Sequence, residues 1–132
     1  MNGSRSRYGA GPNAINPLYV SGGSSSGSAY VVATGQVDFA LGTDTAGSDR
    51  VPAGLNNIVG LKPSRGLISA RGVLPAAQSV DCVSIFARTV AMAVKVLETA
   101  IGFDPLDPFF AQAGVIGAAF WCGVPLWRVI GA

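Results

Sequence analysis

The chain has 132 residues, of which 49% are hydrophobic and only 12% are charged, and its formal net charge is +2. A chain of this length forms one domain or part of one, and its charged fraction is about half that of an average soluble domain. Its nine basic residues are scattered along the chain, so a nucleic-acid-binding surface is not expected. A composition so poor in charge is typical of a membrane protein, a module packed against partner subunits, or an interior segment of a larger globular protein.

The cysteines argue against metal and thiol chemistry. Cys82 and Cys122 lie forty positions apart, and the sequence contains no histidine. Neither a zinc site nor a Cys–His dyad can be assembled from these residues, so we expect no metal and no cofactor. Free buried thiols are typical of a reducing compartment, which favours a cytoplasmic location. Residues 1–17 are polar and glycine-rich, unlike a secretion signal.

The elements alternate between helix and strand along the chain. Residues 1–23 are rich in glycine, proline, asparagine and serine, which predicts a loop. A helix is predicted over residues 25–35, with serines at its N-cap and a glycine as its stop. Apolar periodicity and turn residues then predict strands at 37–43, 58–61 and 80–86, and helices at 53–57 and 89–101. This order predicts an α/β fold with a mixed β-sheet flanked by helices.

The last segment, residues 109–132, is strongly apolar. The stretch 109–127 approaches the length of a membrane span, but three glycines and a proline interrupt it, so we expect instead a core strand with a loop, or a C-terminus that lacks its native continuation. The predicted organisation is therefore a glycine- and proline-rich N-terminal loop over residues 1–23, a core segment over 24–108, and an apolar tail over 109–132.

Two loops rich in glycine and serine are expected to meet. The helix at 25–35 travels about 16 Å and the following strand returns about 23 Å, so residues 22–24 and 45–48 finish near one another. Loops gathered at one end of a sheet are where α/β folds place ligands. Serine is a weak nucleophile without a base, and the lack of histidine excludes a Ser-His-Asp triad. A desolvated lysine is the remaining candidate for the base.

Residues 22–66 read GGSSSGSAYVVATGQVDFALGTDTAGSDRVPAGLNNIVGLKPSRG. They resemble the amidase signature family, whose hallmark is a glycine-serine loop followed by GTDxxGSxRxPA and then GLKPT, and the resemblance extends over about residues 5–105. Within the family, the stretch SARGVLPAAQSVDCVSIFARTV is similar to allophanate hydrolase. The resemblance implies the amidase-signature fold, present here as a partial domain. It also implies hydrolysis of a small amide or urea-derived substrate, with allophanate giving ammonia and carbon dioxide, and it is compatible with a homodimeric full-length protein.

The same resemblance implies roles for individual residues. The nucleophile falls on Ser48, and the bridging serine, which follows a cis peptide bond in the family, falls on Ser24. The oxyanion hole would consist of the backbone N–H groups of Thr45, Ala46, Gly47 and Ser48. Asp44 and Arg50 would brace this loop, although Arg50 could instead hold a substrate carboxylate, and Ser25 would support the site or cap the helix. We interpret Asp38 and Asp81 as polar groups at strand edges, and Cys82 as a buried small side chain.

The third catalytic group of the family is a lysine several dozen residues before the bridging serine. None of the 23 residues before Ser24 is a lysine, while Lys62 matches the GLKP motif and Lys95 lies within a predicted helix. We therefore expect the chain to begin inside an amidase domain and to have little activity alone. The alternative is a non-catalytic remnant that binds a partner or an anion through its glycine loops. A phosphate-binding module is disfavoured because GxxxxGK[ST] is absent.

Overall fold

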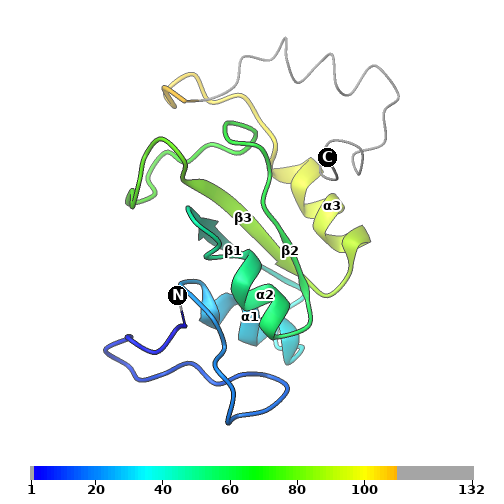
Figure 1. Ribbon diagram of the computed structural model, residues 1–132. Helices are drawn as coiled ribbons and strands as arrows, with labels where there is room; N and C mark the ends of the chain where they lie inside the picture. The colour runs from blue at the N-terminus through cyan, green and yellow to red at the C-terminus, as the bar shows by residue number, and fades with distance from the viewer. Residues whose placement is uncertain (1, 110–132) are drawn as a thin grey trace.

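The computed structural model describes residues 2–109, which form three strands and three helices (Figure 1). In chain order the elements are α1 (Ser26–Ala33), β1 (Phe39–Asp44), α2 (Arg50–Leu55), β2 (Val59–Leu61), β3 (Cys82–Ala87) and α3 (Val90–Ala100). Each predicted helix and strand within these residues is present, with ends shifted by no more than three residues. The apolar tail predicted over 109–132 lies outside the described residues except for Phe109.

The sheet has the order β1-β3-β2, and both pairings are antiparallel. Asp44 at the end of β1 pairs with Cys82 at the start of β3, and Leu61 of β2 pairs with Ile85. The predicted α/β class is confirmed. Within the described residues, however, the sheet is antiparallel rather than mixed, because β3 inserts between two strands that both run opposite to it.

Helices cover both faces of the sheet (Figure 1), and the alternation of side chains along β3 explains how. Ile85 and Ala87 point to the face covered by α3 and pack against Ala93 and Leu97. Phe86 points to the opposite face, which α1 and α2 cover through Ala29, Val32 and Ala53. The central strand β3 is therefore buried on both sides and packs against the helices of both outer layers.

Helix α1 begins at a serine, but not in the way the sequence predicts. Ser25 is the N-cap residue, yet its side chain makes no capping hydrogen bond. Its hydroxyl instead contacts the backbone of Thr43, at 3.3 Å from the N–H and 3.4 Å from the carbonyl. The Ser28 hydroxyl likewise donates to the Leu41 carbonyl at 2.8 Å. The capping prediction is wrong because these hydroxyls tie α1 to β1 instead.

Helix α3 follows the predicted pattern closely. Thr89 is its N-cap and accepts a hydrogen bond from the Met92 N–H at 3.2 Å, as expected for a threonine at this position. Ala93 and Leu97, four residues apart on one face, are its buried residues.

Residues 2–23 form neither helix nor strand, as predicted for the N-terminal loop. Asn13 anchors this loop, since its side-chain amide donates to the Leu55 carbonyl at 2.8 Å and to the Val20 carbonyl at 3.1 Å. The Ala14 N–H also donates to the side chain of Asn56 at 2.8 Å. The loop is thus fixed to the end of α2. Among the described helices, none has the length and apolar character needed to cross a membrane.

Candidate active site

The two glycine-serine loops meet in the structure. The Ser25 N–H donates to the Ser48 carbonyl at 3.2 Å, which joins the start of α1 to the loop that follows β1. This contact arises because α1 and β1 run in opposite directions, so the chain returns to the place where α1 began. The predicted proximity of residues 22–24 and 45–48 is confirmed.

The backbone of the first loop has the feature that the family resemblance implied, because the peptide bond between Gly23 and Ser24 is cis. Ser24 is exposed and immediately precedes the Ser25 N–H that contacts the second loop. Ser48 is 7% exposed, so it lies just beneath the surface. The two serines therefore belong to adjoining backbone segments.

A buried carboxylate organises the second loop. Asp44 is fully buried and accepts hydrogen bonds from the backbone N–H groups of Gly47 (2.8 Å), Asp49 (3.2 Å) and Arg50 (3.4 Å). The Arg50 guanidinium adds a bidentate pair, with Nε and Nη2 each 3.0 Å from one carboxylate oxygen. Burial alone would raise the pKa of Asp44, but these donors together outweigh it and lower the pKa to about 2.

The Asp44 contacts also bear on the predicted oxyanion hole. Gly47 has a φ of 111°, a left-handed conformation that favours glycine, and its N–H points to Asp44. An N–H group makes one strong hydrogen bond, so the Gly47 N–H braces the loop in this structure. Thr45 and Ala46 lie at the outer part of the same loop, where Ala46 is exposed.

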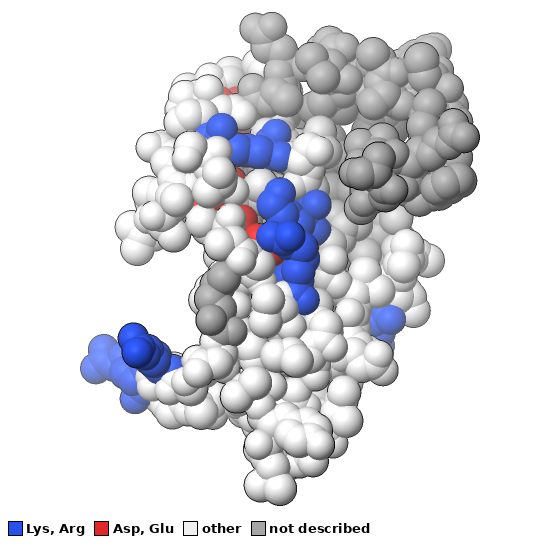
Figure 2. Space-filling view, in the orientation of Figure 1, with Lys and Arg blue, Asp and Glu red and all other residues white. Residues whose placement is uncertain are grey.

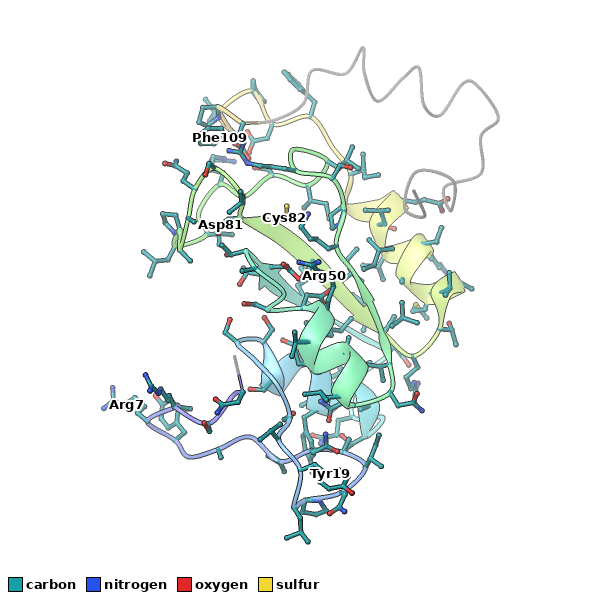
Figure 3. All side chains as sticks on the ribbon, viewed as in Figure 1. Arg7, Tyr19, Arg50, Asp81, Cys82 and Phe109 are labelled. Atoms are coloured by element: carbon teal, nitrogen blue, oxygen red, sulfur yellow. The ribbon has the colours of Figure 1, made fainter. Side chains whose placement is uncertain are left out.

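A second carboxylate, Asp81, holds the loop from the opposite side. It accepts a hydrogen bond from the Thr45 hydroxyl and further bonds from the N–H groups of Ala76 (2.9 Å) and Ala77 (3.0 Å). Donation by Thr45 is the main reason that the pKa of Asp81 is lowered. Figure 3 shows Asp81, Cys82 and Arg50 in one region, far from Arg7 and Tyr19.

Sequence reasoning missed this role of Asp81, which we interpreted as a polar group at a strand edge. The pairing of Asp44 with Cys82 makes Thr45 and Asp81 the next opposed residues, one step beyond the ladder. The antiparallel register would have identified the pair, but no local pattern in the sequence fixes that register.

Asp49, next to Ser48, is the most unusual ionisable group in the described residues. It is fully buried, and neither carboxyl oxygen has a hydrogen-bond partner within residues 2–109. Burial raises its pKa to about 7, and the negative charge of Asp44 adds to the effect. The Ser84 hydroxyl and Arg50 act in the opposite direction, although Ser84 does not meet the geometry of a hydrogen bond. The neutral form of the Asp49 carboxyl is therefore favoured far more than that of an exposed aspartate.

A hollow of about 240 Å³ lies beside the second loop. Asp81 lines it together with Arg65, Arg71 and Gln78, and Phe109 forms part of the wall. Arg65 stacks over the Phe109 ring at 3.9 Å from the ring centre. Asp81 both lines this hollow and binds Thr45, so the hollow adjoins the predicted oxyanion loop.

Basic and acidic side chains near the two loops differ in their exposure to solvent. Figure 2 shows basic side chains grouped over the centre of the visible face, with only small areas of acidic surface between them. Asp44, Asp49 and Asp81 contribute little to that surface because all three are buried. The accessible charge around the second loop is therefore mainly positive.

The two lysines of the chain, Lys62 and Lys95, lie in different parts of the structure. The Lys62 ammonium donates to the carbonyl of Pro63 at 3.2 Å, within the segment after β2. Lys95 lies on α3 and lines a groove beside Phe39, on the face of the sheet opposite to α1. Cys82 is a buried free thiol. No group of three Cys, Asp or Glu side chains among residues 2–109 is suited to hold a metal ion.

Comparison with known proteins gives consistent results. Residues 1–114 match the family model described as Amidase. The chain is 56% identical over 103 residues to urea amidolyase of Saccharomyces cerevisiae, covering 78% of this chain and 6% of that protein. It is 52% identical over 100 residues to Amidase 1 of Oryza sativa subsp. japonica, covering 74% of this chain and 23% of that protein.

The solved structures agree with this relationship. Allophanate hydrolase of Kluyveromyces lactis superposes with a TM-score of 0.83 and 51% identity, over 85% of this chain and 18% of that one. The 132 residues thus span less than a quarter of the length of these three relatives. The match of the family model over most of the sequence shows that the chain belongs to the Amidase family.

Proposed function

We propose that this chain carries the nucleophile and bridging serine of an amide hydrolase that acts on a small, urea-derived substrate. The observation that supports the proposal most strongly is the junction of the two glycine-serine loops at the Ser25–Ser48 contact, in a loop braced by the buried Asp44 and its exposed partner Arg50. Relatives named urea amidolyase and allophanate hydrolase favour allophanate as the substrate.

In the proposed reaction, the Ser48 hydroxyl oxygen bonds to the amide carbonyl carbon while its proton passes to Ser24. The Ser24 hydroxyl proton passes in turn to a base. The negative charge on the carbonyl oxygen is stabilised by backbone N–H groups of Thr45, Ala46 and Ser48, which need no reorganisation because the loop is braced beforehand. The Gly47 N–H is not among these donors, because it donates to Asp44 and so stabilises the loop.

The carbon–nitrogen bond then breaks, the leaving nitrogen takes up the proton, and ammonia departs. The acyl group remains as an ester on Ser48 until water attacks the same carbon and releases it. With allophanate, the released acid is an N-carboxylated carbamate, which loses two molecules of carbon dioxide and frees the second nitrogen as ammonia, so that allophanic acid and one water give two ammonia and two carbon dioxide. Neither Lys62 nor Lys95 occupies a position suited to the base, so we propose that a residue outside these 132 positions supplies it.

The same proposal includes a role for Arg50, a cellular location and a statement about partners. Arg50 is committed to Asp44 in a bidentate pair, which favours a bracing role over capture of a substrate carboxylate. We also propose a cytoplasmic location, from the buried thiol, and no nucleic-acid partner.

The test uses the protein that carries this sequence at its natural length. A fluorophosphonate probe, which forms a covalent bond with an activated serine, is expected to label Ser48, and Ser48→Ala is expected to abolish both labelling and amide hydrolysis. Ser64→Ala is the matched control, because Ser64 is exposed in a separate segment and should leave both unchanged. A folded wild-type protein that is neither labelled nor active would support a non-catalytic remnant.

A further inference from the structure

Two carboxylates hold the loop of residues 45–48 from different sides. Asp44 accepts backbone N–H groups from the inner part of the loop, as the family resemblance implied. Asp81 instead accepts the side-chain hydroxyl of Thr45, at the outer part. The two contacts are independent, since one carboxylate ends β1 and the other precedes β3.

Asp81 is itself firmly held. Its oxygens accept from the Ala76 N–H at 2.9 Å and from the Ala77 N–H at 3.0 and 3.1 Å. It is only 9% exposed, so water competes little for these bonds. An acceptor fixed by backbone donors on one side can fix the orientation of the donor on its other side.

The position of Asp81 is set by the sheet. Strands β1 and β3 pair up to Asp44 and Cys82, and the next opposed residues are Thr45 and Asp81. Thr45 is therefore held where the chain leaves the sheet and turns toward Ser48. A change in the orientation of Thr45 at this point would rotate the peptide groups that follow it.

We propose that Asp81 is a positioning residue for the oxyanion hole, which orients the backbone N–H groups of residues 45 and 46 by binding the Thr45 hydroxyl. The catalytic role that this inference gives to Asp81 rests on the proposed function. It assigns to Asp81 a task separate from that of Asp44, because Asp81 acts on the outer peptides of the loop and Asp44 on the inner ones.

The experiment compares Asp81→Asn, Thr45→Val and Thr45→Ser in the protein at its natural length. Valine has the shape of threonine without the hydroxyl, whereas serine retains the donor. We expect Asp81→Asn and Thr45→Val to lower kcat about tenfold or more with KM changed less than about twofold, since the lost alignment matters mainly in the transition state. Thr45→Ser should retain most of kcat.

Two further comparisons separate positioning from general loss of structure. Asp104→Asn is the matched control, because Asp104 accepts from the Ser69 hydroxyl (2.8 Å) and from Arg71 (2.8 Å) near the same hollow but does not contact the second loop. It should leave kcat within about twofold. The double variant Asp81→Asn/Thr45→Val should be no worse than either single variant, because both changes remove one interaction.

A readout that does not require activity completes the test. Amide hydrogen exchange of residues 44–50, measured by mass spectrometry, should be faster in Asp81→Asn and Thr45→Val and unchanged in Asp104→Asn. If the wild type proves inactive, the proposed function fails, and the exchange rates alone decide whether Asp81 anchors the loop. Unchanged exchange, or an active wild type with undiminished kcat in Thr45→Val, would overturn the inference, and this holds even if Asp81→Asn does not fold.

Discussion

Two buried carboxyl groups near Ser48, those of Asp44 and Asp49, differ sharply in pKa. Asp44 and Asp49 are both fully buried and five positions apart, yet the pKa of the first is lowered to about 2 and that of the second is raised to about 7. The difference lies in their partners, because Asp44 receives backbone N–H groups and a guanidinium, while Asp49 receives none within residues 2–109. The donors therefore keep Asp44 charged despite its burial, whereas burial disfavours the charge of Asp49.

These shifts predict how stability depends on pH. Asp49 has a higher pKa folded than unfolded, so its contribution is fully present below pH 3.8 and is lost as the pH rises toward about 7, by up to about 4 kcal/mol. Asp49→Asn should therefore be more stable than wild type at pH 8 and close to it at pH 4, as measured by urea unfolding. Asp38→Asn, at an exposed position, is the control.

The stability of the protein should also decrease at acidic pH, because Asp44 is shifted in the opposite direction. Asp44 has a lower pKa folded than unfolded, so its contribution is present above pH 3.8 and is lost as the pH falls toward 2. From these two groups, stability should consequently be greatest near pH 4 and should decline as the pH rises from there toward 7. A wild-type protein whose stability rises steadily from pH 4 to 8 would contradict the environment described for Asp49.

At the scale of elements, the junction of α1 with β1 places the site. Ser25 and Ser28 direct their hydroxyls to the backbone of β1, which fixes the start of α1 beside the loop after that strand. This approach requires a glycine in β1. A Cβ atom at Gly42 would lie 2.8 Å from the Ser25 hydroxyl oxygen and 2.7 Å from the Phe86 ring.

Gly42→Ala is therefore expected to destabilise the protein by about 1–3 kcal/mol, because the added methyl group overpacks a rigid junction. Thermal or urea unfolding measures the change. Gly54→Ala, in α2, is the matched control, since a Cβ there meets no atom within 4 Å, and it should be neutral or stabilising by up to about 1 kcal/mol. Equal effects of the two substitutions would argue against the close approach of Ser25.

At the scale of the whole molecule, the sheet has an apolar edge at β1 that pairs with no further strand in the described residues. Strand β1 pairs only with β3 within residues 2–109, and Phe39 and Leu41 are about half exposed beside a groove formed with Met92 and Val96 of α3. Such an edge is a template for association with other chains. The relatives provide far more chain than these 132 residues.

The isolated 132-residue chain is accordingly expected to associate as its concentration increases, and Leu41→Lys should reduce that association, because a charge on the edge opposes strand pairing. Sedimentation velocity at several concentrations measures the effect. Leu74→Lys is the matched control, since Leu74 is 93% exposed but lies outside the sheet. A larger effect at Leu74 than at Leu41 would contradict the prediction.

Much of this molecule could be predicted from local patterns. Helical spacing and a terminating glycine located α1 and α3, and the opposed directions of α1 and β1 predicted that the two glycine-serine loops would meet. The capping role of Ser25 was mispredicted, because a hydroxyl near a helix start can bind either its own backbone or that of a neighbouring strand, and local sequence does not distinguish the two.

The amino-acid sequence by itself determined the positions of the elements, the family and the pair of serines, because these depend on residues close together along the chain. Only the tertiary structure decided the strand order, the register that sets Asp81 against Thr45, and the burial of Asp49 beside Gly60 and Ser84. These features join residues 11 to 48 positions apart, and their energies depend on which groups exclude water from one another, which only the folded arrangement fixes.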